Sequence, residues 1–194
     1  MRLFVGVPLD PELTRRVGSF VDTLRSRVAQ IAPHAPLSWV APERLHLTLA
    51  FIGDVPESRT PTIQVALEQT TTVRRFQLEL AGAGAFPPRG RPRVLWVGVH
   101  EGRESLISLA GDVRARLDAV GVALEPRPFS PHLTVARVKE PTGLRPSSLL
   151  EGLTDVAIGR MTVDAITLFQ SRLSPSGASY HVLARCPLSG TAPS

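Results

Sequence analysis

Two short segments of this chain place a histidine two residues before a threonine, once in LHLTLA and again in PHLTVA. Both segments are typical of β-strands, in which successive side chains point to opposite faces. His46 and Thr48 therefore share one face of the first strand, and His132 and Thr134 share one face of the second. Imidazole gains or loses a proton near neutral pH, and a threonine hydroxyl donates a hydrogen bond. Each strand thus offers an acid–base group beside a hydrogen-bond donor.

Cleavage of a phosphodiester would use this pair of side chains twice. The attacking and leaving oxygens lie roughly in line on opposite sides of phosphorus, so one histidine can act as the base and the other as the acid. Thr48 and Thr134 can donate hydrogen bonds to the oxygens on which charge develops. This chemistry needs no cofactor. The sequence has no HExxH motif, and neither histidine is followed by an acidic residue two or four positions later. These usual signs of a metal site are therefore missing. A single histidine on a strand is more often structural, so the inference depends on the two copies together.

The elements that carry these segments occur twice in the same order, as judged from alternating and helical spacing of apolar residues. The first copy has a strand at 2–8, a helix at 11–31, an extended piece at 38–41, the HLT strand at 45–52, a poorer helix at 57–73 and a strand at 75–81. A Gly- and Pro-rich loop follows at 82–92. The second copy has a strand at 93–99, a helix at 103–120, the HLT strand at 131–138, a short helix at about 146–153, a strand at 161–169, a turn at 174–177 and a last strand at 178–185.

This duplication predicts the fold class. Each copy alone would leave one face of its sheet bare, so the two copies must pack together. We expect an α+β, bilobal protein with two mostly antiparallel sheets around a central cleft, helices outside and both HLT strands lining the cleft. It would be a single domain built from pseudo-symmetric halves at about 1–85 and 90–186, with residues 187–194 as a frayed tail.

The composition is that of a globular protein, because 43% of the 194 residues are hydrophobic and 20% are charged. No apolar run reaches the roughly 20 residues of a membrane-spanning helix, and the first residues indicate a buried strand rather than a signal peptide. The single cysteine, Cys186, excludes a disulfide framework and favours the reducing cytoplasm. All but one of the 22 basic residues are arginine, and the net charge is +5. Arginine suits phosphate binding, although a GC-rich genome also produces an arginine-rich chain.

Five segments of the chain carry a family resemblance. They are RLFVGVPL at 2–9, WVAPERLHLTLAFIG at 39–53, RPRVLWVGV at 91–99, FSPHLTVARV at 129–138 and SRLSPSGASYHVL at 171–183. With them the chain resembles the two-histidine (2H) phosphoesterase superfamily. More narrowly, it is similar to the RNA 2',3'-cyclic phosphodiesterases, also called LigT-like or 2'-5' RNA ligase family proteins. The resemblance covers nearly the whole chain, and the two HxT motifs are its most specific part.

The resemblance implies a metal-independent enzyme that opens the terminal 2',3'-cyclic phosphate of RNA to leave a 2'-phosphate. His46 would protonate the leaving 3'-oxygen and His132 would activate water, and a pseudo-symmetric pair can exchange these roles with the direction of reaction. Thr48 and Thr134 would hold the phosphate. Some relatives also join tRNA halves through a 2'-5' linkage by the reverse reaction. The expected partners are RNA ends, tRNA halves among them, or cyclic nucleotides; no membrane is expected, and the expected state is a monomer.

Four further residues are candidates for substrate binding. Arg137 matches the arginine that follows the second motif in relatives. Strict alternation places it on the face opposite His132, so it reaches the cleft only if the strand bulges or ends first. Trp39, Phe129 and Tyr180 have side chains that can stack on a terminal base. The alternative for these three aromatic residues is a structural place in the core.

Two other functions stay open at this point. The same machinery can act on a small cyclic nucleotide or another phosphodiester, because loops outside the motifs decide the substrate. A non-catalytic protein that binds RNA ends is the second alternative. Binding alone, however, does not need two titratable groups.

Overall fold

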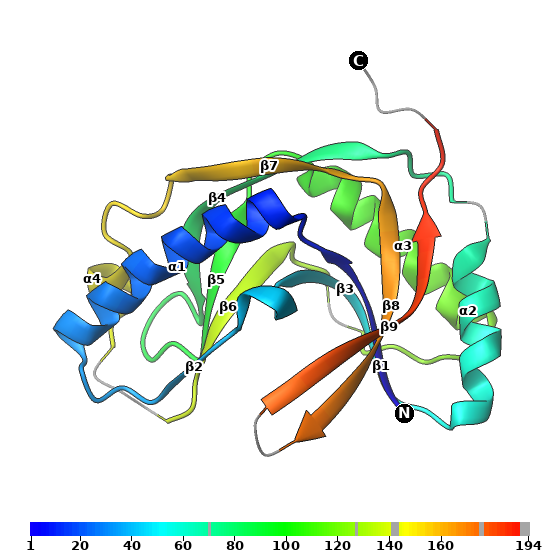
Figure 1. The fold of residues 1–194 in the computed structure, drawn as a ribbon, viewed down its shortest axis with the longest axis horizontal. Coiled ribbons are helices and arrows are strands. Elements are labelled where there is room, and N and C mark those ends of the chain that lie inside the picture. Colours follow the sequence, from blue (N-terminus) through cyan, green and yellow to red (C-terminus); the bar gives the residue numbers. More distant parts are fainter. Residues whose placement is uncertain (70, 127, 141–143, 175–176, 191–194) are drawn as a thin grey trace.

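The computed structural model describes residues 1–69, 71–126, 128–140, 144–174 and 177–190. Figure 1 shows two curved β-sheets that form an arch, with helices packed against them. The protein is α+β and bilobal, and all strand pairs within its two sheets are antiparallel. The sequence-based prediction of the fold class is therefore confirmed.

Each sheet contains one of the two HLT strands. Sheet A has four strands in the spatial order β3-β1-β8-β9. They are β1 (Arg2–Pro8), β3 (His46–Asp54), β8 (Ala165–Ser174) and β9 (Gly177–Pro187). Sheet B has five strands in the order β2-β6-β5-β4-β7. They are β2 (Leu37–Trp39), β4 (Phe76–Phe86), β5 (Val94–Val99), β6 (His132–Val138) and β7 (Ala157–Val163).

Both sheets combine strands from the two halves of the sequence. In sheet A, β8 from the second half pairs with β1 from the first. In sheet B, β4 from the first half pairs with β5 from the second. Neither sheet is complete without strands from the other half, so the two lobes of the molecule do not coincide with the two sequence copies.

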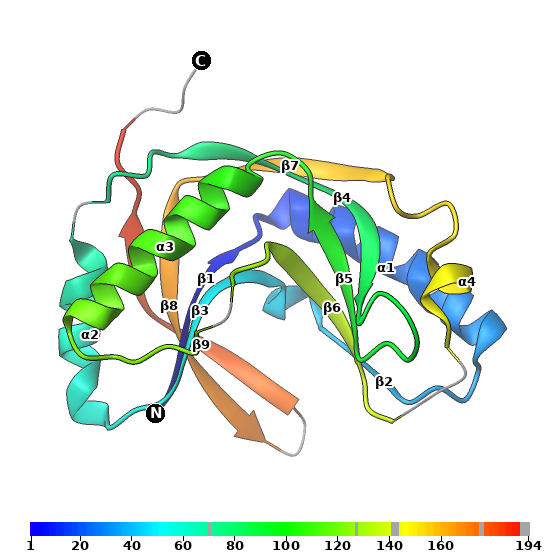
Figure 2. The ribbon, with the colours of Figure 1, turned by 180° about the vertical axis from the view of Figure 1, so that it is seen from behind.

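The helices cover the outer faces of the sheets. α1 (Pro11–Ile31) begins after Asp10, whose carboxylate accepts a hydrogen bond of 2.7 Å from a backbone N–H of the first turn. Its apolar side packs against β7 of sheet B and against α4 (Pro146–Leu150). α3 (Arg103–Ala119) packs against β3 of sheet A and against α2 (Thr60–Glu68). Figure 2 shows α2 and α3 at one end of the molecule and α1 with α4 at the other.

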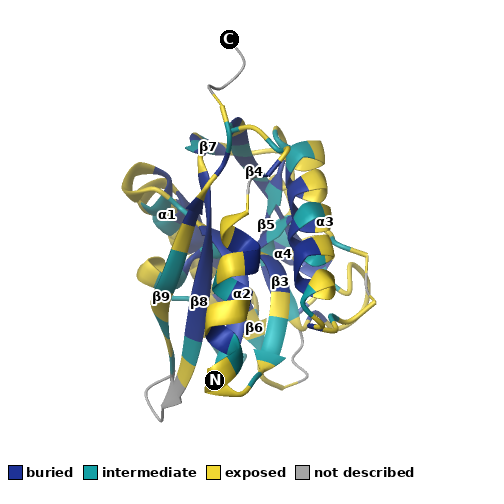
Figure 3. Ribbon diagram, turned by 90° about the vertical axis from the view of Figure 1, so that its right-hand side faces the viewer, coloured by how far each residue is buried: buried dark blue, intermediate teal, exposed yellow. Residues whose placement is uncertain are grey.

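Buried apolar side chains from both sheets and all four of these helices form one continuous core. Figure 3 shows buried residues along the strands and exposed residues on the outer sides of the helices. The residue between His and Thr in each motif belongs to this core, since Leu47 is 1% exposed and Leu133 is 0% exposed. The strands that carry the histidines are therefore held from behind by the packed interior.

Several element boundaries differ from those predicted. The helix expected at 57–73 is a 3-10 turn at Glu57–Arg59 followed by α2, which ends at Glu68. A further 3-10 turn at Pro42–Arg44 precedes β3. The strand expected to stop before the 82–92 loop continues to Phe86, because residues 83–86 pair with β5 and Gly84 leaves room for the ring of Trp96. The strand expected at 161–169 is two strands, β7 and β8, which belong to different sheets.

The C-terminal end is held further than expected. Leu188 is buried, and the Ser189 hydroxyl donates a hydrogen bond of 2.8 Å to the Thr71 carbonyl oxygen. The frayed tail predicted from residue 187 is therefore wrong for residues 187–190. Residues 191–194, and the centre of the turn predicted at 174–177, lie outside the described residues. Within the described ranges, no helix has both the length and the apolar character needed to cross a membrane.

Candidate active site

Both motif strands contain a β-bulge directly after the threonine. In β3, the pairing with β1 passes from Thr48 to Ala50 and leaves Leu49 as an extra residue. In β6, the pairing with β5 passes from Thr134 to Ala136 in the same way. A bulge changes which side of the sheet the following residues face. The residue three positions after each threonine therefore turns to the side that carries the histidine.

The motif residues meet at one cavity of about 490 Å³, called here the central cavity. His46 and Thr48 reach it from β3, and His132 and Thr134 reach it from β6. Its other lining residues are Arg2, Phe4, Val40, Arg44, Phe51, Arg137, Ser171, Ala178 and Tyr180. Two imidazoles, two hydroxyls and several guanidinium groups thus surround a single space.

Both histidines are fixed by the same type of hydrogen bond. His46 Nδ1 lies 2.8 Å from the carbonyl oxygen of Arg44, and His132 Nδ1 lies 2.7 Å from the carbonyl oxygen of Ser130. A carbonyl oxygen can only accept, so Nδ1 carries the hydrogen in both neutral rings. Nε2 is then the nitrogen that each ring offers to a substrate.

Aromatic side chains enclose His46. The ring centroids of Phe4, Tyr180 and Phe169 lie 4.7, 5.2 and 6.1 Å from that of His46. Burial among them lowers the pKa of His46 below its ordinary value. The hydrogen bond to the backbone carbonyl opposes this shift, and the positive charge of Arg137 adds to it. Without a bound anion, a larger share of His46 is therefore neutral at neutral pH than for an ordinary histidine.

The surroundings of His132 are more open. Phe86 and Trp96 lie beside it, with ring centroids at 5.1 and 6.4 Å. Two further cavities reach His132 in addition to the central cavity. His132 thus lines three of the cavities described here, whereas His46 lines the central cavity and is flanked by aromatic rings.

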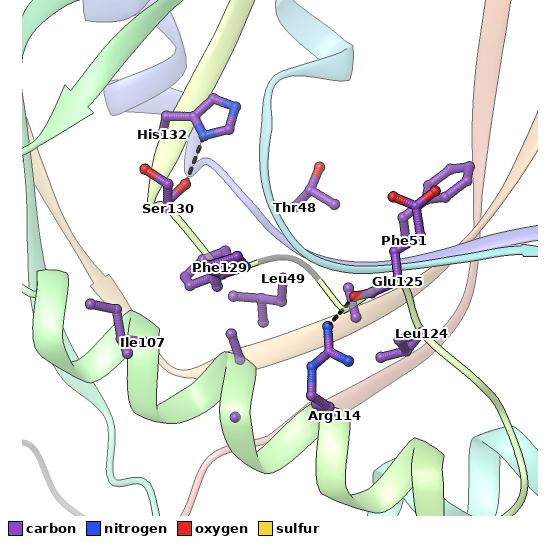
Figure 4. Close-up of a pocket in the computed structure, with 14 residues that line it drawn as sticks. Thr48, Leu49, Phe51, Ile107, Arg114, Leu124, Glu125, Phe129, Ser130 and His132 are labelled. Atoms are coloured by element: carbon purple, nitrogen blue, oxygen red, sulfur yellow. Dashed lines mark hydrogen bonds between the residues drawn. The ribbon is translucent and has the colours of Figure 1, made fainter.

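The first of these further cavities, called here the apolar cavity, has a volume of about 650 Å³ and lies between β3, α3 and the segment before β6. In Figure 4, Leu49, Phe129 and Ile107 lie along its walls, with His132 and Thr48 on the side of the motif strands. The second, called here the polar cavity, has a volume of about 760 Å³ and lies on sheet B beside β4, β5 and β7.

The bulge in β6 brings Arg137 into the central cavity. Strict alternation places Arg137 on the face opposite His132. The bulge at the extra residue Val135 reverses this and lets Arg137 line the central cavity. Phe51 holds the equivalent position after the first motif. It is 50% exposed and lines both the central and the apolar cavity. The two halves therefore place a cation and an aromatic ring at equivalent positions of the cleft.

The three aromatic candidates lie in different places. Tyr180 lines the central cavity, and Phe129 lines the apolar cavity. Trp39 lines neither of them. It is half-buried against the core, and the guanidinium carbon of Arg25 lies 5.2 Å from its ring centroid. The position of Trp39 gives no support to its predicted role in stacking on a base.

Sequence reasoning missed Arg2, Phe4 and Phe51 as lining residues of the central cavity. A signal existed for Phe4, because FVGV near the start of the first half recurs as WVGV in the second. This repeat puts Phe4 and Trp96 at equivalent positions, and each ring lies beside a motif histidine. Phe51 had no such signal, because the bulge that turns it inward is not visible in an alternating sequence.

The central cavity is equipped for proton transfer and anion binding. In the described part of the chain, no group of three or more His, Cys, Asp or Glu side chains is placed to hold a metal ion. The cavity instead offers two imidazoles for proton transfer, and hydroxyl and guanidinium donors for the oxygens of a phosphate.

Known proteins share this combination of sequence and fold. The sequence profile of the 2'-5' RNA ligase superfamily matches residues 13–174, which include both motifs. The chain belongs to this superfamily. An RNA 2',3'-cyclic phosphodiesterase of Aeropyrum pernix is 38% identical over 163 residues, which is 82% of this chain and 90% of the relative. One from Methanothermobacter thermautotrophicus is 36% identical over 182 residues, with 93% and 95% of the two chains covered.

Solved structures extend the likeness over nearly the whole chain. A crystal structure from Thermus thermophilus superposes with a TM-score of 0.75 at 30% identity, covering 97% of this chain and 98% of the other. The structure of E. coli LigT in complex with 3'-AMP gives a TM-score of 0.74 at 26% identity with the same coverage.

Proposed function

We propose that this member of the 2'-5' RNA ligase superfamily hydrolyses 2',3'-cyclic phosphate ends of RNA to 2'-phosphates, with two histidines as acid and base. The observation that carries the proposal is the matched pair of imidazoles in the central cavity. Each has its Nδ1 bonded to the carbonyl oxygen two residues before it, which leaves Nε2 for the substrate. The names of the relatives describe the same activity.

In this reaction the cyclic phosphate lies between the two rings. His132 Nε2 takes a proton from water, whose oxygen attacks phosphorus. The bond between phosphorus and the 3'-oxygen breaks, and protonated His46 gives its proton to that oxygen. The open surroundings of His132 suit a water molecule that must enter, and the enclosed His46 suits an oxygen that stays on the ribose. The negative charge of the bound phosphate favours protonation of His46 and offsets the effect of Arg137.

The remaining side chains of the central cavity would bind and orient the phosphate. Thr48 and Thr134 donate to its non-bridging oxygens, where charge develops during the attack. Arg137 can bind the same oxygens through its planar guanidinium group. Tyr180 and Phe129 are the aromatic side chains available to stack on a base.

The test uses a short RNA that ends in a 2',3'-cyclic phosphate, in the presence of EDTA. Wild-type protein should give a product heavier by one water and carrying a 2'-phosphate, identified by mass and phosphatase sensitivity. His132→Ala should lose about 10²–10⁴-fold in rate, the usual contribution of one acid–base group. His34→Ala is the matched control, because His34 is exposed and is not part of the central cavity.

Each outcome separates the proposed function from its alternatives. Full activity of folded His132→Ala would contradict the site assignment. Turnover of a cyclic mononucleotide without turnover of the RNA would indicate an enzyme for small cyclic nucleotides. Binding of the RNA end without turnover of either substrate would indicate a non-catalytic end-binding protein.

A further inference from the structure

One guanidinium group of the central cavity has neither a polar partner among the described residues nor a role in the proposed reaction. Three arginines line this cavity, Arg2, Arg44 and Arg137. Arg44 donates a hydrogen bond of 2.7 Å to the Ala178 carbonyl oxygen, and Arg137 can bind the cyclic phosphate. The side chain of Arg2 forms no hydrogen bond or ion pair with the described residues, not even with Asp54, its pairing partner in β3. Its positive charge is therefore available to an anionic ligand.

The surroundings of Arg2 orient its side chain and supply a second donor. The guanidinium carbon lies 5.0 Å from the centroid of the Phe51 ring, a distance at which an aromatic face attracts a cation. Ser171 is the pairing partner of Arg2 in β8, and both residues line the central cavity. The hydroxyl of Ser171 likewise has no hydrogen-bond partner in the described part of the chain. Several N–H donors and a hydroxyl thus line the same part of the cavity, which suits the oxygens of a phosphate.

Arg2 lies next to the residue of β1 that flanks His46. The ring centroid of Phe4 lies 4.7 Å from that of His46, and Phe4 follows two residues after Arg2 on the same cavity. Alternate residues of a strand share a face and are roughly 6.6 Å apart. A group bound at Arg2 is therefore separated from a group bound at His46 by about the width of one sugar.

The proposed reaction puts the ribose of the substrate on this side of the cavity. His46 protonates the 3'-oxygen, which stays on the terminal ribose, so this ribose lies at His46 rather than at His132. In an RNA chain the 5'-oxygen of the same ribose carries the next phosphate, whereas 2',3'-cyclic AMP has only a hydroxyl there. This next phosphate is one sugar away from the cyclic phosphate and is negatively charged. Its distance and its charge match the position and the charge of Arg2.

We propose that Arg2 and Ser171 bind the phosphodiester on the 5' side of the terminal ribose. This inference rests on the proposed function and extends it from the reacting phosphate to its neighbour in the chain. Binding at Arg2 would favour RNA ends, which have this phosphate, over cyclic mononucleotides, which lack it. The contact with Phe51 orients the guanidinium before the substrate binds, so less rotamer freedom is lost on binding.

The test compares two dinucleotide substrates that differ only at this phosphate. One is adenylyl-adenosine with a normal 3'-5' phosphodiester and a terminal 2',3'-cyclic phosphate. The other has a methylphosphonate at the same linkage, which keeps both nucleosides and removes the negative charge. The measured quantity is the ratio of kcat/KM for the first substrate to kcat/KM for the second, with the whole chain. Wild-type protein should give a ratio of about ten or more, as for a hydrogen bond to a charged group.

Arg2→Gln should lower this ratio about tenfold, because the amide that remains has no charge to attract the phosphate. Arg2→Lys keeps the charge and should retain most of the ratio. Arg172→Gln is the matched control, because it removes the same charge from the residue after Ser171. Arg172 is exposed and does not line the central cavity, so the ratio should keep its wild-type value.

Added salt gives a second readout, which a purely structural role of Arg2 would not change. The wild-type ratio should fall as the salt concentration rises, because salt weakens the additional contact with a phosphate. The ratio of Arg2→Gln should not depend on salt, because that contact is already lost.

A wild-type ratio of one would overturn the inference and leave the proposed function intact, because both dinucleotides would still be hydrolysed. An unchanged ratio in folded Arg2→Gln would also overturn it, since the phosphate would then be bound elsewhere. If Arg2→Gln does not fold, Ser171→Ala decides, and an unchanged ratio in that variant would overturn the inference. Hydrolysis of neither dinucleotide by folded wild-type protein would overturn the proposed function itself.

Discussion

At the scale of single residues, the two catalytic candidates, His46 and His132, make the same type of hydrogen bond but have different surroundings. Both rings bond through Nδ1 to a carbonyl oxygen. Only His46 is enclosed by three aromatic rings, and burial lowers its pKa. His46 is therefore expected to be less protonated than an ordinary histidine before any substrate binds.

NMR titration of the His46 imidazole measures this shift in its pKa. His46 should titrate below the ordinary histidine pKa of 6.5, because burial disfavours its cation and Arg137 adds repulsion. Arg137→Gln should raise the pKa of His46 without restoring the ordinary value, since the burial remains. Unchanged titration of His46 in the variant would show that Arg137 does not act on the ring.

The lowered pKa of His46 also makes stability depend on pH. The unfolded chain binds a proton at His46 near pH 6.5, and the folded chain binds it only at lower pH. Between these values the unfolded state holds more protons, so the free energy of unfolding decreases as pH falls through this window. Urea unfolding above and below pH 6.5 measures this loss in the free energy of unfolding. The loss should be smaller for His46→Asn than for the wild-type protein. Equal losses would contradict the enclosed environment of His46.

The threonines should matter less than the histidines. Thr48→Val and Thr134→Val keep the shape of the side chain and remove its donor, so each should lower the hydrolysis rate by about 10²-fold, as for an oxyanion donor. The fold should persist, because Thr48 is exposed and Thr134 is half-buried. A larger loss in either valine variant than in His46→Ala and His132→Ala together would contradict the acid–base mechanism.

At the scale of elements, the position of His46 depends on how closely β1 approaches β3. A Cβ atom on Gly6 would lie 2.9 Å from the Leu47 carbonyl oxygen and 3.2 Å from His46 Cδ2. Gly6→Ala should therefore push the strands apart, lower the free energy of unfolding by about 1–3 kcal/mol and reduce hydrolysis. Thermal melting and the RNA assay measure both effects.

Gly18→Ala is the matched control for this substitution. Gly18 lies in α1, and a Cβ atom there has no neighbour within 4 Å. The variant should keep full activity and gain about 0.5–1 kcal/mol of stability, because alanine is the better helix former. Equal behaviour of the two alanine variants would show that the contact of β1 with β3 does not position His46.

The elements also show what could be predicted from the sequence. Alternation and helical spacing depend only on residues near each other in the sequence. They therefore predict most strands and helices near their observed positions, and they place both histidines on the strand faces that line the central cavity. The bulges at Leu49 and Val135 depend on pairing with a neighbouring strand, so alternation alone assigned Arg137 to the wrong face. The chain breaks between β7 and β8 because the two strands belong to different sheets. A pattern of neighbouring residues does not predict to which sheet a strand belongs.

At the scale of the whole molecule, the exchange of strands between the halves joins the two lobes. β8 completes sheet A, β4 completes sheet B, and one core runs through both. We therefore expect a single cooperative unfolding transition in calorimetry, with equal van 't Hoff and calorimetric enthalpies. Two separate transitions would show that the lobes are independent folding units.

The same strand order has a consequence for protein synthesis. A chain grows from its N-terminus, so β1 and β3 leave the ribosome long before β8 and β9, which complete their sheet. Phe169 and Tyr180, which enclose His46, are in these late strands. A polypeptide released before β8 and β9 are made, even one that contains both motifs, lacks two of the three aromatic rings that surround His46. The central cavity is therefore incomplete until β8 and β9 have been synthesised.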